Sequence, residues 1–134
     1  MNRITDPKGK PPIFVSEGDF DRIVALLEDV GKQFPVAAQE LEAEIERAQI
    51  APLAAMAPDV VRMGSTVEFL TQGAQPMRVT LVFPQEADIA QHKVSILSPV
   101  GTALLGLSKG QSIPWFGPDG RPHTLTVLDV SPPA

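Results

Sequence analysis

The hydrophobic period of this 134-residue chain changes once, at a connector that contains two prolines. Before the connector, apolar side chains recur at intervals of three and four residues, which is typical of helices. After it, apolar and polar residues alternate, which is typical of half-buried strands. Pro52 removes an amide that a helix needs, and Pro58 biases the preceding residue toward extended backbone. The sequence therefore predicts an α+β protein with two parts, a helical part in residues 1–51 and a sheet in residues 58–134. Residues 1–12 are predicted to be a loose lead-in to the first part.

The part before the connector predicts two antiparallel helices. Ser16 is followed three residues later by Asp19, a spacing typical of a capping box at a helix start. Gly31 can end this helix, and Pro35 suits the first turn of a second helix that we expect to extend to Ile50. Because the connection is so short, the two helices must form an antiparallel hairpin, similar to a short coiled coil.

The second predicted helix carries a seam of small and apolar side chains, which are Ala38, Leu41, Ile45 and Ala48. Helical spacing places all four on one side, where the first helix alone or a second copy of the chain could cover them. The same helix is rich in glutamate. Glu40 and Glu44 share a face, and Glu44 can pair with Arg47 one turn further on.

The residue types along residues 93–116 predict a strand, a short helix and another strand in close succession. Lys93–Leu97 is aliphatic and β-branched, which favours a strand. Ser98 is the predicted N-cap, and Pro99 suits the first helical position. Gly106 can adopt the left-handed conformation that ends the helix. Other strands are predicted near residues 67–69, 79–83 and 123–130, which gives a mostly antiparallel sheet with one short helix.

The run Ser-Pro-Val-Gly-Thr-Ala-Leu-Leu-Gly-Leu, followed by Lys-Gly-Gln-Ser-Ile, resembles the C-terminal domain of the bacterial transcript-cleavage factors GreA and GreB. Most closely it resembles their small relatives of the Rnk family, named as regulators of nucleoside diphosphate kinase. Supporting motifs lie in residues 58–67 and 117–120, so the resemblance covers residues 16–130. It implies a C-terminal sheet similar to the fold of the FK506-binding proteins. A shared fold does not imply a shared activity, so isomerase activity is not carried over.

The resemblance implies that the C-terminal domain binds RNA polymerase near the entrance of its secondary channel. The implied contact is the loop before the short helix, whose residues here are Leu97, Ser98, Pro99, Val100 and Gly101. A purely structural role of Ser98 and Pro99 as a helix cap is compatible with docking. This chain departs from the cleavage factors at Leu97, where they are commonly polar or acidic, and at Gln111, where they are often acidic.

Glu28 and Asp29 lie next to the predicted tip of the hairpin, and Lys32 follows in the turn. In the Gre cleavage factors, an acidic pair at the tip of a long coiled coil enters the polymerase and helps to hold a second catalytic metal ion, which needs oxygen ligands. Each helix predicted here has about fifteen residues and so spans only roughly 22 Å. The acidic tip motif of the family is also not recognisable. We therefore expect no cleavage activity.

Composition excludes several classes of chemistry. The chain has no cysteine, which removes disulfides, thiol nucleophiles and cysteine-held metals. His92 and His123 stand without acidic partners at metal-ligand spacing, and the glycines do not form a phosphate-binding loop. We therefore expect a protein that is not an enzyme and holds no metal or other cofactor. A net charge of −5 disfavours direct binding of nucleic acid.

No apolar run is long enough for a signal peptide or a membrane span, so we expect a cytoplasmic protein without membrane contact. One alternative is a regulator that binds another cytosolic protein, or forms a homodimer, through the helical hairpin. Another is a prolyl isomerase, which the absence of tyrosine and of a dense aromatic pocket disfavours. Trp115 and Phe116 could form a contact patch, although we expect at least one of them in the core.

Overall fold

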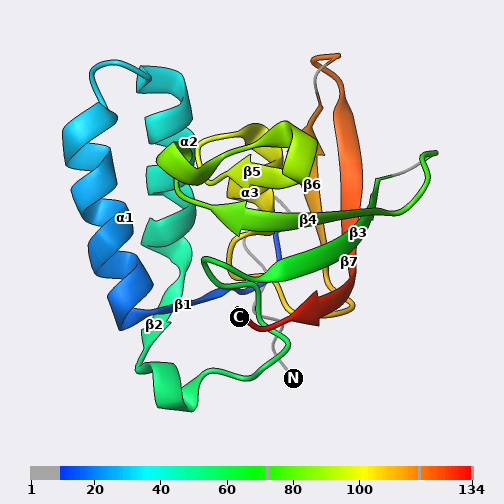
Figure 1. Cartoon of the computed structure of the whole chain (residues 1–134), viewed down its shortest axis with the longest axis horizontal. Coiled ribbons are helices and arrows are strands. Elements are labelled where there is room, and N and C mark those ends of the chain that lie inside the picture. The colour runs from blue at the N-terminus through cyan, green and yellow to red at the C-terminus, as the bar shows by residue number, and fades with distance from the viewer. Residues whose placement is uncertain (1–9, 72, 118, 134) are drawn as a thin grey trace.

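Two N-terminal helices lie side by side along one end of a curled β-sheet that the rest of the chain forms (Figure 1). The structure is a computed structural model and describes residues 10–71, 73–117 and 119–133. Most of the predicted lead-in, residues 1–9, lies outside the described residues, as does Gln72, which lies between the strands predicted near residues 67–69 and 79–83. The predicted α+β arrangement, with an N-terminal helical hairpin, a sheet and one short helix, is confirmed.

The helical hairpin consists of α1 (Glu17–Val30) and α2 (Pro35–Arg47). The predicted cap is present, because the Ser16 hydroxyl oxygen accepts a hydrogen bond from the Asp19 amide at 3.1 Å. Helix α1 ends at Gly31 as predicted, but with ordinary helical backbone at that residue. The glycine is required there because a Cβ atom would lie 2.6 Å from the Leu27 carbonyl oxygen.

The predicted end of the second helix at Ile50 is wrong. Helix α2 ends at Arg47, and Gln49–Ala51 forms strand β2, which pairs in parallel with strand β1 (Phe14–Ser16). The Gln49 amide donates to the Ile13 carbonyl oxygen at 2.9 Å, which extends this pairing. Tertiary pairing with a distant segment therefore overrides the helical periodicity of the last three predicted residues.

Five strands form the main sheet in the order β5-β4-β3-β7-β6, and among the strand pairs described for this sheet only β4–β5 is parallel. The sheet is therefore mostly antiparallel, as predicted. The strands are β3 (Thr66–Thr71), β4 (Met77–Val82), β5 (Lys93–Ser95), β6 (Ser112–Phe116) and β7 (Pro122–Ser131). The helical segments of this part are α3 (Pro99–Leu104) and the single 3-10 turns η1 (Leu53–Ala55), η2 (Pro84–Glu86) and η3 (Ile89–Gln91).

One apolar core spans the hairpin and the sheet. Most of the predicted seam of α2 is buried within the single chain, since Leu41 is fully covered, Ile45 and Ala38 are nearly so, and Ala48 is half-buried. The same cluster continues through the sheet and α3. Its fully buried members include Ile13, Ile23, Leu41, Val61, Leu81, Ile96, Leu104, Leu107, Ile113 and Leu125.

Gly106 brings the segment after α3 against β1. Its φ of +79° confirms the predicted left-handed conformation, and its carbonyl oxygen accepts from the Phe14 amide at 3.1 Å. A Cβ atom at this position would lie 2.8 Å from Cβ of Ile13. Glycine is therefore required both for the backbone angle and for the close approach of the N-terminal strand.

The carboxylate of Asp19 makes a second connection between the two parts of the chain. Only 6% of Asp19 is exposed. One carboxylate oxygen accepts from the backbone amide of Met63 at 3.0 Å, and the other pairs with Arg22 at 2.6 Å. Arg22 also lies over the ring of Phe83, 5.0 Å from its centre. Asp19 therefore holds the start of α1 against the segment that leads into β3.

Replacing Asp19 by alanine should destabilise the protein, because the buried Met63 amide would lose its acceptor. We expect the free energy of unfolding to fall by about 1–3 kcal/mol. Asparagine, which retains an acceptor oxygen, should cost less. Urea denaturation followed by circular dichroism measures both. The matched control is Asp21→Ala, two positions along the same helix and exposed. Equal stability of the Asp19→Ala and Asp21→Ala proteins would contradict the prediction.

Candidate functional site

The loop before α3 is held by hydrogen bonds within its own residues. The Ser98 hydroxyl donates to the Ser95 carbonyl oxygen at 2.7 Å and accepts from the Gly101 amide at 3.1 Å. The Thr102 hydroxyl donates to the Ile96 carbonyl oxygen at 2.7 Å, and the Leu97 amide donates to the Ser95 hydroxyl oxygen at 3.0 Å. The predicted cap at Ser98 is therefore present, and the loop has a fixed shape without any partner.

The five residues predicted to dock differ in exposure. Pro99 is exposed, whereas Leu97, Ser98 and Val100 are half-buried. Leu97 and Val100 pack against the apolar core. Gly101 is buried, and a Cβ atom there would lie 2.1 Å from the Ser95 carbonyl oxygen. The absence of a side chain at Gly101 thus allows α3 to approach the loop, and Pro99 is the most exposed of the five residues.

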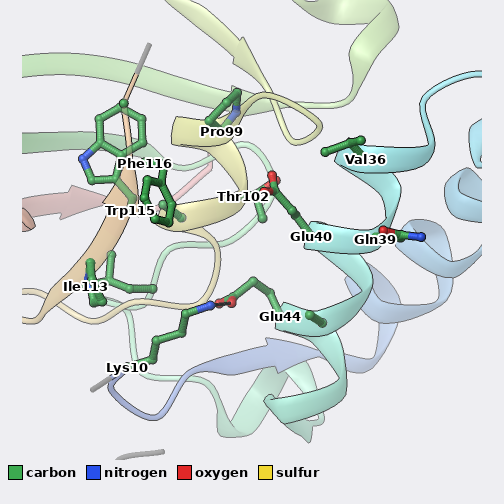
Figure 2. A pocket seen from close by; sticks show the side chains of 14 residues that line it. Lys10, Val36, Gln39, Glu40, Glu44, Pro99, Thr102, Ile113, Trp115 and Phe116 are labelled. Carbon is green, nitrogen blue, oxygen red and sulfur yellow. Dashed lines mark hydrogen bonds and ion pairs between the residues drawn. The ribbon is translucent and has the colours of Figure 1, made fainter. Parts of the chain in front are cut away.

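Pro99 lies on the edge of a groove of about 750 Å³ between α2, α3 and β6. Figure 2 shows Val36, Glu40 and Glu44 on the α2 side, facing Trp115 and Phe116 across the groove. The remaining lining residues are Lys10, Gln39, Ala43, Thr102, Ala103, Ile113, Pro114 and Gly117. Sequence reasoning identified the shared face of Glu40 and Glu44 but not the groove, which depends on the long-range packing of α2 beside α3.

The two glutamates on this face have different surroundings. Glu44 is 4% exposed and pairs with Lys10 at 2.8 Å and, as predicted, with Arg47 at 2.9 Å. Arg47 also donates to the Pro11 carbonyl oxygen, which fixes the N-terminal segment against α2. Glu40 is exposed and makes no ion pair within the described chain. The groove therefore has one compensated and one uncompensated carboxylate.

The three residues predicted at the hairpin tip lie apart from this groove. Glu28 and Asp29 are exposed in the last turn of α1, and Lys32 is exposed in the turn that follows. None of the three lines the groove that contains Pro99. Across the described residues, no group of three or more histidine, aspartate or glutamate side chains is arranged to hold a metal ion. The tip thus contributes two neighbouring carboxylates without a third ligand.

The expectation that His123 stands without an acidic partner is wrong. The turn between β6 and β7 brings Asp119 back beside it, and His123 Nε2 lies 3.0 Å from Asp119 Oδ1. The Arg121 backbone amide also donates to Oδ1 at 2.9 Å. The pKa of the Asp119 carboxyl is lowered from 3.8, chiefly by the Arg121 amide and next by the His123 hydrogen bond. The pair orders the end of the hairpin whose Phe116 and Gly117 line the groove.

A lowered pKa means that the ionised carboxyl of Asp119 stabilises the folded turn above pH 3.8, and that this stabilisation is lost as the pH falls through the folded-state value. Carboxyl NMR titration should give a midpoint below 3.8 for the folded protein. In His123→Ala the midpoint should rise without reaching the value in urea, because the Arg121 amide still donates. Identical midpoints for wild type in buffer and in urea would contradict this prediction.

No helix in the described parts of the chain has the length and apolar character needed to cross a bilayer. The helices instead place their apolar faces in the core, as described above.

Comparison with known proteins divides the chain into two matches. Residues 55–132 match the family described as transcription elongation factor GreA/GreB, C-terminal, and residues 11–50 match the family described as Rnk N-terminus. The regulator of nucleoside diphosphate kinase of Escherichia coli K12 is 38% identical over 122 residues, which is 90% of each chain. GreA of Azorhizobium caulinodans is 37% identical over 92 residues, 68% of this chain and 58% of that protein.

A solved structure supports the same relationship. A prokaryotic GreA/GreB transcription elongation factor from Nitrosomonas europaea aligns with a TM-score of 0.72 and 39% identity, over 91% of this chain and 99% of that one. The relatives that cover both matched regions have the same small size, whereas this chain spans little more than half of GreA. The chain therefore belongs to the Rnk branch of the GreA/GreB family of transcription factors.

Proposed function

We propose that this protein is a cytoplasmic regulator that binds RNA polymerase near the entrance of the secondary channel and does not stimulate transcript cleavage. Residues 58–134 provide the docking domain, and residues 1–51 provide the hairpin. Leu97, Ser98, Pro99, Val100 and Gly101 form the docking loop. Support comes from family membership, since the relatives that this chain resembles are named as transcription elongation factors or as a regulator.

The observation that carries the proposal is the exposure of Pro99 on a loop that is already ordered. The hydrogen bonds of Ser98 and the glycine contact of α3 fix the loop, so docking need not order it. A surface that is formed before binding loses less conformational entropy when its partner arrives. Pro99 also borders the groove, so the loop is continuous with a concave surface.

The short length of the hairpin supports the proposal that the protein does not stimulate transcript cleavage. Helix α1 has 14 residues and α2 has 13. The longer one therefore extends about 21 Å at 1.5 Å per residue. Much of that length lies against the core instead of projecting from it. Glu28 and Asp29 are thus too near the body of the protein to reach a deep active centre. The alternative of a homodimer through the α2 seam is not favoured, because Ala38, Leu41 and Ile45 are already buried within one chain.

Binding to purified RNA polymerase by biolayer interferometry tests the docking proposal. Pro99→Ala should weaken binding by about fivefold, which corresponds to the ~1 kcal/mol expected for an interface side chain. The matched control is Pro35→Ala, since Pro35 is also exposed and occupies the start of a helix. Serine 98 is unsuitable as the sole test, because losing its cap also destabilises α3. Failure of the wild type to bind at moderate salt would refute the proposal.

A transcript-cleavage assay tests the second part. Stalled, backtracked polymerase complexes with labelled RNA and Mg²⁺ should shorten their RNA at the same rate with and without this protein. A GreA protein serves as the positive control. The double variant Glu28→Ala, Asp29→Ala should behave like wild type, because these carboxylates have no assigned catalytic role. Faster cleavage with wild type that is lost in the double variant would contradict the absence of cleavage activity.

A further inference from the structure

We propose that the groove between α2, α3 and β6 receives a segment of RNA polymerase that presents an apolar side chain beside a lysine or arginine, and that Glu40 of the hairpin selects the basic residue. This inference rests on the proposed function, because it extends the docking surface from the loop at Pro99 to the groove that Pro99 borders. It assigns the N-terminal hairpin a direct part in docking.

The apolar part of the partner follows from two side chains on opposite sides of the groove. Val36 on α2 is 69% exposed and Phe116 on β6 is 65% exposed, although both are large and apolar. Figure 2 shows the groove lying between them, with Trp115 and Ile113 on the side of Phe116 and α3 in the middle. Exposed apolar residues that border one concave surface are typical of an interaction site. Apolar side chains from a partner in the groove would remove both from water.

The basic part of the partner follows from the charges of the groove. Glu44 is neutralised by Lys10 and Arg47, which leaves Glu40 as the carboxylate without an ion pair among the described lining residues. Glu42 and Glu46 are exposed on the same helix but do not line the groove, and Arg47 is engaged with Glu44. The carboxylate of Glu40 therefore attracts a cationic side chain in the groove and opposes an anionic one.

The edge strand β6 indicates how the partner is held. The Gly117 amide donates to the Arg121 carbonyl oxygen, and the Val127 amide donates to the Gln111 carbonyl oxygen. The backbone amide and carbonyl groups of the odd-numbered residues of this strand are therefore directed toward β7. Those of the even-numbered residues are directed toward the free edge, where Pro114 has no amide hydrogen to donate. A partner strand therefore cannot form an unbroken ladder along β6. The groove is suited to side chains from a helix or turn, and not to an added strand.

The groove is formed before the partner binds, because separate contacts hold α2 in place. Asp19 attaches the hairpin to Met63, and Glu44 with Lys10 and Arg47 attaches α2 to the N-terminal segment. α2 also packs beside α3 within the common core. Glu40 is thus presented at a fixed position relative to Pro99, which is a condition for selecting a partner residue by charge.

Charge reversal tests the role of Glu40. We expect Glu40→Arg to weaken binding to purified RNA polymerase about tenfold at low salt, through loss of attraction and new repulsion. The matched control is Glu42→Arg, which makes the same change on the same helix at an exposed residue outside the groove. We expect it to change affinity less than threefold. The difference between the two variants should shrink in 0.5 M salt, where charges are screened.

Site-specific crosslinking tests the groove directly. Phe116 is replaced by p-benzoylphenylalanine, and Met77, an exposed apolar residue outside the groove, is replaced in the same way as control. Irradiation with RNA polymerase should give a crosslinked polymerase subunit from position 116 and none from position 77. Urea denaturation of each variant verifies that it is folded.

The outcomes separate this inference from the proposed function. Absence of polymerase binding by the wild type would overturn both. Binding that is weakened by Pro99→Ala, but equally affected by Glu40→Arg and Glu42→Arg and without a crosslink from position 116, would overturn the groove and leave the docking loop. A crosslink from 116 together with a selective effect of Glu40→Arg would support the groove and its preference for a basic residue.

Discussion

The buried carboxylate of Asp19 determines how the two parts of this chain are joined. A helix that is attached only by a short loop can adopt many orientations, whereas one that accepts a hydrogen bond from the Met63 amide cannot move without exposing a buried donor. The pairing of Arg22 with the other oxygen compensates the charge of that carboxylate. The position of α2, and with it one wall of the groove, depends on this junction.

This arrangement creates the groove that we propose as a docking surface, which neither part of the chain has alone. The short helix α3 and strand β6 provide one side and the floor of the groove, and α2 provides the other. Because the hairpin lies against the sheet, its residues form part of the proposed docking groove although the hairpin is short. The proposed docking therefore gives the hairpin a role that does not require it to reach a distant catalytic centre.

The sequence predicts features that local geometry determines and misses those that depend on distant segments. The cap at Ser98 and the left-handed Gly106 follow from residue types and spacing, and both are present. The strand Gln49–Ala51 could not be predicted, because its pairing with β1 competes with an uninterrupted helical pattern. The spacing of Asp19 indicates a helix cap, whereas its carboxylate is used for Met63, 44 residues away. The groove was missed for the same reason.

Glu40 and Glu44 lie on one face of α2 but differ in role: Glu44 is structural, and Glu40 is the residue that we propose for binding. Both residues line the groove, four positions apart, and the described part of the N-terminal segment, at Lys10 and Pro11, lies at the end of the face that holds Glu44. There Lys10 and Arg47 compensate the charge, so this carboxylate can be buried. Among the described residues, no such segment covers the face toward the hairpin tip, and Glu40 is exposed there. The glutamate nearer the end of α2 therefore attaches the helix to the N-terminal segment, and the glutamate nearer the tip is the one proposed to pair with a partner.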